Sequence, residues 1–239
     1  MPVQLPFTWV LNQPCLSKYP PSVRDVFHEE LDAINQSLVA LGLLTQQALD
    51  SATHALLTAD LALAEKVIAE DDKVDDAQHL LDAQTIDLMA RQQPVANDLR
   101  ALVTSLRMSA DLERMGDMAH HIAKLARMRH PATAVPPELL LTVQEMGRVA
   151  SKIVGKAVGL IESRDTEAAK LLEKDDDEMD ILHRKLFAVL LDPNWSHGIE
   201  TAIDMTLIGR YYERFADHAV SIARRVYFLV TGEYYTSQS

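Results

Sequence analysis

The sequence predicts an all-α protein of six helices, arranged as two tandem three-helix units related by an internal repeat. Three observations support this prediction. Alanine and leucine abound while only 8 of the 239 residues are glycine, a composition that favours helices over sheets. Apolar residues return every three or four positions along most of the chain, which is the period of an α-helix. Two segments of the first half also recur in the second half.

The recurring segments set the register of the repeat. "ADLALAEKVIAEDDKVD" at 59–75 aligns with "RDTEAAKLLEKDDDEMD" at 164–180, an offset of 105 residues (164 − 59). "ERMGDMAHHIA" at 113–123 aligns with "ERFADHAVSIA" at 213–223, an offset of 100 (213 − 113). Each unit alone is small for a stable core, so we expect the two units to pack together.

The order of the elements follows from breaks in the apolar period. Asp60 and Asp165 precede helical stretches as N-caps, "RQQPV" and "LDPNWSHG" turn the chain, and a proline-rich segment separates the halves. We expect helices at about 22–57, 61–91, 94–128, 137–162, 166–191 and 197–231. The predicted organisation is a flexible N-terminal extension (1–21), a first unit (22–130), a second unit (131–232) and a C-terminal tail (233–239).

Charge and cysteine content narrow the function classes. The net charge is −12, which speaks against nucleic-acid binding and suits cations or a basic partner surface. The single cysteine, Cys15, excludes an internal disulfide and a cysteine-cluster zinc site. No apolar run is long enough to span a bilayer, and the first residues lack the features of a secretory signal. We therefore expect a cytoplasmic protein.

Carboxylates continue an apolar stripe on the third expected helix. Glu113 and Asp117 follow, at steps of three and four residues, the apolar positions Leu99, Val103, Leu106 and Ala110. The period places both acids on the face expected to be buried. A second acid pair with four-residue spacing, Asp71 and Asp75, lies on the inner stripe of the preceding helix.

These two helices share a short turn near Pro94 and should be antiparallel neighbours. Asp75 and Glu113 each lie 19 residues from the turn (94 − 75 and 113 − 94), and Asp71 and Asp117 each lie 23. At about 1.5 Å rise per residue the four acids meet at one level. The second half repeats the arrangement around a turn near Ser196, with Asp176, Asp180, Glu213 and Asp217.

Four facing carboxylates repel one another, and burial without a counter-charge is costly or raises their pKa. Bound cations, nearby arginines or exposure to water would each relieve the repulsion. A single Glu-x-x-x-Asp is usually a solvated helix face, but four acid pairs matched across two hairpins favour cation sites. Carboxylate oxygens suit Mg²⁺, Ca²⁺ and Mn²⁺, and bridging carboxylates also suit iron.

The arginines and histidines near these acids are not placed by the sequence as clearly as the acids are. Arg114 and Arg214 follow the glutamates directly but point about 100° away around the helix, so we expect them to serve other faces. Three histidines follow an acid at three or four residues, but none recurs at the matching position of the other repeat. We expect them at the surface or beside the ligands rather than as ligands: His79, His121 and His183.

Two long segments resemble a known family. "ARQQPVANDLRALVTSLRMSADLERMGDMAHHIAKLA" is similar to the first signature of the PhoU family, and "LIGRYYERFADHAVSIARRVYFLVTGE" to the second. The resemblance covers about residues 23–233, including "FHEELDAI", and is strongest to actinobacterial members. It leaves the N-terminal extension unmatched.

The resemblance implies a cytoplasmic negative regulator of phosphate uptake that keeps the phosphate-starvation response off when phosphate is plentiful. The implied partners are the ATP-binding subunit of the phosphate ABC transporter and a sensor histidine kinase. Some members bind multinuclear clusters of iron or zinc through their acid-x-x-x-acid motifs. Carried over, these motifs fall on Asp71, Asp75, Glu113, Asp117, Asp176, Asp180, Glu213 and Asp217. A homodimer is the expected assembly, without nucleic acid and with membrane contact only through partners.

One departure from the repeat affects the turn ends. Asp98-Leu99-Arg100 has Gly198-Ile199-Glu200 opposite it, so the two units should differ there. The sequence shows neither a glycine-rich loop nor arginines clustered at a helix start, and thus no phosphate site.

We expect a non-enzymatic regulator, and two alternatives stay open. One is an accessory protein of a different phosphate permease. The other is a ferritin-like di-iron carboxylate enzyme, which needs Glu-x-x-His pairs. Gly116 and Ala216 stand three residues after the two glutamates, which disfavours the enzyme.

Overall fold

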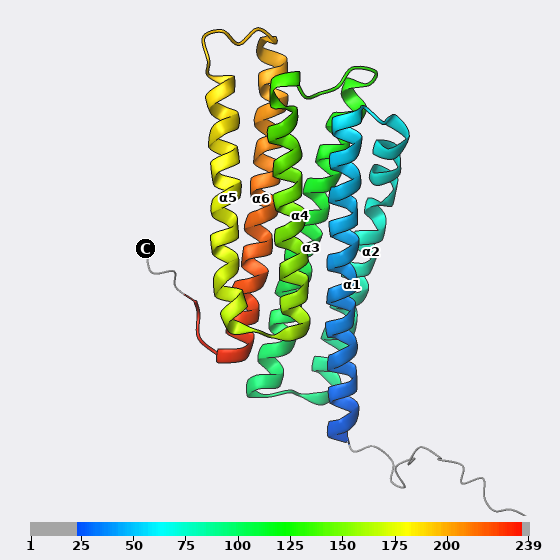
Figure 1. Cartoon of the computed structure of the whole chain (residues 1–239). Helices are drawn as coiled ribbons and strands as arrows, with labels where there is room; N and C mark the ends of the chain where they lie inside the picture. The colour runs from blue at the N-terminus through cyan, green and yellow to red at the C-terminus, as the bar shows by residue number, and fades with distance from the viewer. Residues whose placement is uncertain (1–22, 236–239) are drawn as a thin grey trace, which may run out of the picture.

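The computed structural model describes residues 23–235, and six long α-helices run up and down through them (Figure 1). The helices are α1 (Val23–Thr58), α2 (Leu61–Gln92), α3 (Ala96–Arg129), α4 (Leu140–Ser163), α5 (Thr166–Leu190) and α6 (Gly198–Thr231), with a 3₁₀ turn (Pro137–Leu139) before α4. No strand occurs in the described part, so the all-α prediction is confirmed. The predicted flexible extension (1–21) and residues 236–239 of the predicted tail lie outside the described residues.

The predicted helix starts rest on capping chemistry that the structure confirms. A carboxylate oxygen of Asp60 accepts a hydrogen bond from the backbone N–H of Leu63 at 3.0 Å. Asp165 accepts from the N–H groups of Glu167 and Ala168 at 2.9 and 3.0 Å. These bonds satisfy N–H groups that have no partner inside the helix. The first turn of the fourth expected helix is 3₁₀, with Pro136 as its N-cap and Pro137 as its first residue.

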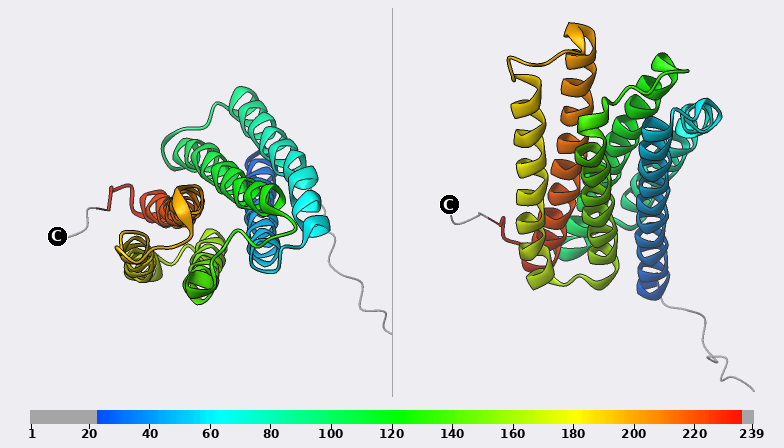
Figure 2. Two further views of the ribbon diagram at one scale, coloured as in Figure 1. Left: turned by 90° about the horizontal axis from the view of Figure 1, so that it is seen from above. Right: turned by 45° about the horizontal axis from the view of Figure 1, so that its top comes forward.

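Two pairs of helices that occupy equivalent positions in the two units pack against each other. α1 lies against α4 and α3 lies against α6, whereas α2 and α5 pack mainly within their own units. Seen from above, α2 and α5 occupy opposite sides of the bundle (Figure 2). The Gln46 amide donates to the backbone oxygen of Ser151 at 3.0 Å, and these two positions are equivalent in the repeat (151 − 46 = 105). The units are therefore related by a pseudo-twofold axis.

The two units share one apolar core. Tyr212 and Phe215 of α6 are fully buried, and the Tyr212 hydroxyl hydrogen bonds to Thr53 of α1 at 2.8 Å. The predicted boundary between the units at residues 130 and 131 therefore does not separate two cores. It stays a prediction about where the sequence repeat divides. None of the described helices is long and apolar enough to cross a membrane.

Among the ion pairs that join α3 to α6, two link an arginine to a buried carboxylate, and the sequence did not predict either. The Arg225 guanidinium donates to Asp111 at 2.5 Å, and Arg129 donates to Asp204 at 2.6 Å. Asp111 and Asp204 are only 7% and 4% exposed. Buried carboxylates need such partners, so both pairs fix how the two units meet.

Gly42 of α1 lies at a close approach of the two units. A Cβ atom there would lie 2.5 Å from a methyl group of Val158 on α4. Because a β-branched side chain has little rotamer freedom in a helix, Gly42→Ala should lower the free energy of unfolding by about 1–2 kcal/mol. Gly159→Ala is the matched control, since nothing lies within 4 Å of its Cβ position.

We expect Gly159→Ala to raise the free energy of unfolding by about 0.5–1 kcal/mol through helix propensity alone. Urea denaturation of the two variants measures both values. Equal effects would show that α1 and α4 are not in the close contact described.

Candidate metal-binding clusters

The first acid cluster comprises Asp71 and Asp75 of α2 with Glu113 and Asp117 of α3. Burial and the neighbouring charges of Asp71 and Asp117 raise the pKa of Asp75. Burial, Asp117 and the two α2 carboxylates likewise raise the pKa of Glu113, although Arg114 opposes them. The four acids thus act on one another across the α2–α3 hairpin, as predicted from their distances to the turn.

The second acid cluster comprises Asp176 and Asp180 of α5 with Glu213 and Asp217 of α6. Burial and then the charges of Asp217, Asp180 and Glu213 raise the pKa of Asp176 to about 6. Burial and then Glu213 raise the pKa of Asp217. The structure therefore brings together both predicted sets of four carboxylates, one in each unit.

The stripe that carries these acids is less buried than predicted. Leu99 is 42% exposed, Ala110 is exposed, and Glu113 and Asp117 are half-buried. The buried face of α3 instead runs through Leu102, Met108, Leu112, Met115, Ala119 and Ile122. The prediction of a buried stripe was wrong because two adjacent faces of α3 both have helical spacing. The acids flank the core rather than enter it, and water reaches them.

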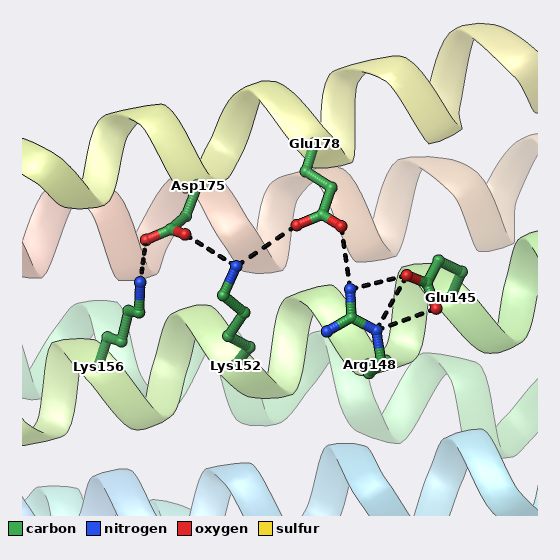
Figure 3. Close-up of polar contacts among 6 residues, drawn as sticks. All are labelled: Glu145, Arg148, Lys152, Lys156, Asp175 and Glu178. Carbon is green, nitrogen blue, oxygen red and sulfur yellow. Dashed lines mark hydrogen bonds and ion pairs between the residues drawn. The ribbon is translucent and has the colours of Figure 1, made fainter.

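On α5, the acids that face α4 differ from those that face α6. Asp175 pairs with Lys152 at 2.9 Å and Lys156 at 2.6 Å, and Glu178 pairs with Arg148 at 2.9 Å (Figure 3). Burial alone would raise the pKa of Asp175, but hydrogen bonds from the two lysines hold it below its ordinary value.

Asp176 is the next residue in the chain, and its pKa moves the other way. No lysine or arginine of the described residues lies within ion-pair distance of Asp176, Asp180 or Asp217. The protein therefore neutralises the acids of α5 that face α4, while Asp176 and Asp180 lack such a partner among the described residues.

One arginine contacts acids of each cluster. For Arg114 this differs from the expectation that it would serve another face of its helix. Arg114 donates to Asp117 at 3.0 Å and lies 3.5 Å from Glu113. The expectation for Arg114 was wrong because its long side chain bends across a helical turn despite its 100° offset. Arg210 contacts Glu213 in the second cluster, whereas no ion pair of Arg214 is found in the described part. Arg114 and Arg210 are both more than half exposed, so these pairs are weak counter-charges.

His120 is a neighbour of the first cluster that the sequence analysis missed. Its Nδ1 hydrogen bonds to a carboxylate oxygen of Asp71, and its Nε2 is buried without a partner among the described residues. The signal was present, since His120 follows Asp117 by three residues and so shares its helix face. An imidazole that orients a ligating carboxylate is a common feature beside metal ions.

The three histidines named in the sequence analysis make no ion pair with the cluster carboxylates in the described part, and their expected place beside the ligands stays a prediction. His121 stacks on Tyr211 at 5.1 Å, and His183 packs against Phe187 at 4.9 Å. His79 is exposed, although its charge acts on Asp75.

The donor set fits a hard or borderline cation, but the side chains are not preset around one. No three acidic or histidine side chains between residues 23 and 235 converge as ligands of a single ion. Asp and Glu side chains have alternative rotamers, and half-buried positions leave room to adopt them. Binding an ion would thus require rotation of side chains on a rigid helical frame.

The raised pKa of Asp176 predicts a pH dependence of stability without metal. Its folded pKa of about 6 lies above its ordinary value of 3.8, so the folded state binds the proton more tightly. Stability is therefore lost as pH rises from about 4 to about 6 and then levels off. Relative to Asp176→Asn, the wild type should lose about 1–2 kcal/mol over this range, because water screens a half-exposed carboxylate.

Chemical denaturation in a chelator, at pH values from about 4 to about 8, measures this difference. A difference that is constant with pH would contradict the raised pKa.

The turn ends of the units differ, as the sequence indicated. α2 and α3 are joined by three residues (93–95), whereas α5 and α6 are joined by seven (191–197). Leu191, Ile199 and Ile203 are exposed there and, with Trp195, line a cavity of about 440 Å³.

The fold and the clusters define a class of protein: a helical scaffold of two repeated three-helix units, each with a carboxylate cluster between its second and third helices. The model of the PhoU domain matches residues 38–126 and 143–226, one match in each unit. The chain belongs to the PhoU family.

Relatives and solved structures agree with this assignment. The phosphate-specific transport system accessory protein PhoU homolog 2 of Mycobacterium tuberculosis is 46% identical over 212 residues, covering 89% of this chain and all of the relative. PhoU homolog 1 of Mycobacterium leprae is 45% identical, covering 89% and 96%. Both are actinobacterial, in line with the sequence resemblance.

Crystal structures of PhoU from Pseudomonas aeruginosa and of the phosphate transport system regulatory protein PhoU from Streptococcus pneumoniae each superpose with a TM-score of 0.78. They are 28% and 25% identical, cover 87% and 88% of this chain, and are themselves covered completely.

Proposed function

We propose that this protein is a cytoplasmic, non-enzymatic regulator that represses phosphate uptake and the phosphate-starvation response. It acts by docking to the ATP-binding subunit of a phosphate ABC transporter and to a sensor histidine kinase. The observation that carries the proposal is similarity over nearly the whole chain to proteins named as phosphate-specific transport system accessory proteins. Those names also favour this function over the alternative of an accessory protein of a different phosphate permease.

We further propose that the two acid clusters hold metal ions, iron or zinc in the first place, with manganese, magnesium or calcium as other candidates. The support is electrostatic. The protein pairs Asp175 and Glu178 with its own cations, whereas no described lysine or arginine forms an ion pair with Asp176, Asp180 or Asp217. A bound metal ion supplies the missing positive charge. In the first cluster, His120 would hold Asp71 in orientation through its Nδ1 contact.

Rigidity suits a docking role. Six helices with one shared core and buried α3–α6 ion pairs form a rigid frame, and the half-buried or exposed acids of the clusters lie at its surface. Metal ions would convert strongly anionic helix faces into nearly neutral ones. A partner surface could then approach without electrostatic repulsion. A homodimer is the proposed assembly of the regulator.

Affinity capture from the native host, grown with ample phosphate, tests the docking proposal. We expect the wild-type bait to recover the transporter's ATP-binding subunit and a histidine kinase, identified by mass spectrometry. The variant Glu113→Gln/Asp117→Asn/Glu213→Gln/Asp217→Asn should recover less of both. Asp175→Asn/Glu178→Gln is the control, because it removes two half-buried acids of α5 that belong to neither cluster. Recovery of neither partner by the wild type would refute docking.

A further inference from the structure

A basic pocket lies between α3 and α6, and none of its lining residues belongs to an acid cluster. It is lined by Arg107, Arg224 and Arg225, by the hydroxyl-bearing side chains of Thr104 and Ser221, and by Phe228 and Tyr234, and its volume is about 150 Å³. The residues come from positions 104–107 and 221–234, more than one hundred residues apart in the chain. For that reason no arginine cluster is visible in the sequence.

The three arginines are not equally neutralised. Arg225 uses its Nε to bind Asp111 at 2.5 Å, and Arg224 binds Glu173 at 2.6 Å. Arg107 is exposed, and no described carboxylate lies within ion-pair distance of it. The pocket therefore carries one guanidinium, that of Arg107, without a carboxylate partner among the described residues. In a chain of net charge −12, this positive site is a local exception.

A fourth arginine borders the pocket behind its aromatic wall. The Arg100 guanidinium lies 5.9 Å from the centre of the Phe228 ring, and its Nε is buried without a hydrogen-bond partner in the described part. Phe228 stacks on Tyr234 with ring centres 4.6 Å apart. Tyr234 is 72% exposed, so its outer face is open to a ligand.

We propose that this pocket binds a phosphate group, either as the free ion or as part of a small phosphorylated molecule. A planar guanidinium matches phosphate oxygens with two parallel hydrogen bonds, and several guanidinium groups with hydroxyl donors suit a tetrahedral anion. The Tyr234 ring would stack on the base or ring of a phosphorylated molecule. The inference goes beyond the proposed function, because it concerns binding by the chain alone.

Calorimetric titration of the purified full-length protein tests the site. The probes are inorganic phosphate and adenosine monophosphate, in a chelator so that no metal ion contributes. We expect one site per chain, and Arg107→Ala should weaken binding at least about tenfold, the usual effect of losing a charge-assisted hydrogen bond. Arg127→Ala is the matched control, since it removes one exposed arginine of the same helix about 30 Å away and should leave binding unchanged.

The two probes separate the sources of the phosphate group. Tighter binding of the nucleotide, lost in Tyr234→Ala, would assign a phosphorylated ring compound. Equal binding of both probes would assign free phosphate. Millimolar or weaker binding of both, or equal losses in Arg107→Ala and Arg127→Ala, would overturn the proposal. Such a failure would leave the docking proposal standing, because affinity capture tests that separately.

Discussion

Replacing Asp176 and Asp217 by asparagine is expected to change stability in opposite directions with and without a divalent metal. In a chelator at about pH 7.5, the double variant should be more stable than the wild type by about 1–2 kcal/mol. The reason is that burial, and then the charges of neighbouring carboxylates, raise the pKa of both carboxyl groups, so their ionised forms destabilise the folded state. Removing the two charges relieves that cost.

With metal present the order should reverse. A metal ion that binds only the folded state adds about 2.7 kcal/mol at one hundred times its dissociation constant. The free energy of unfolding of the wild type should rise by this amount when zinc or manganese is added. The double variant should lack the share of that increase that comes from metal bound at the second cluster. Thermal unfolding with chelator and with metal measures both effects.

The control is Asp175→Asn/Glu178→Gln, which alters the neighbouring face of α5 that is paired with α4. It should be slightly less stable than the wild type without metal and keep the full metal-dependent gain. Two results would contradict the assignment of cation sites. One is a destabilised Asp176→Asn/Asp217→Asn variant in chelator, and the other is an undiminished metal-dependent gain in that variant.

Of the variants described here, Arg225→Leu is expected to lower the free energy of unfolding most, by about 3 kcal/mol. The substitution leaves Asp111 buried between α3 and α6, with only His218 beside it at 3.2 Å. For a chain of this length, that loss corresponds to a fall in the melting temperature of about 6–12 °C.

The adjacent Arg224→Leu is the matched control. Arg224 is half exposed and pairs with Glu173, so its loss should change stability by less than about 1 kcal/mol. The double variant Asp111→Leu/Arg225→Leu should recover part of the loss, since no unpaired charge remains buried. Equal effects of Arg224→Leu and Arg225→Leu would show that the α3–α6 pair does not hold the units together.

Much of the fold follows from local signals in the sequence. Asp60 and Asp165 cap the helices they were predicted to cap, because an N-cap acts within one turn of chain. The matching of Asp75 with Glu113 across a hairpin also follows from the sequence, since a short turn fixes which residues of two antiparallel helices share a level.

Contacts between the units could not be predicted in the same way. The pairing of Asp111 with Arg225 depends on which faces of α3 and α6 meet, and no short turn fixes that. The partly exposed acid stripe and the contact of Arg114 with Asp117 were missed for a different reason. Helical spacing assigns a Cβ direction, but it does not determine the depth of burial or the reach of a long side chain.

Metal content per chain, measured by mass spectrometry after loading with iron, zinc or manganese, tests the central claim most directly. The proteins are the wild type, Glu113→Gln/Asp117→Asn, Glu213→Gln/Asp217→Asn and the variant that combines all four changes. If each cluster holds its own ions, each double variant should lose about half of the metal and the combined variant nearly all of it. A wild type without metal, or double variants with unchanged content, would contradict the claim that these carboxylates form two cation sites.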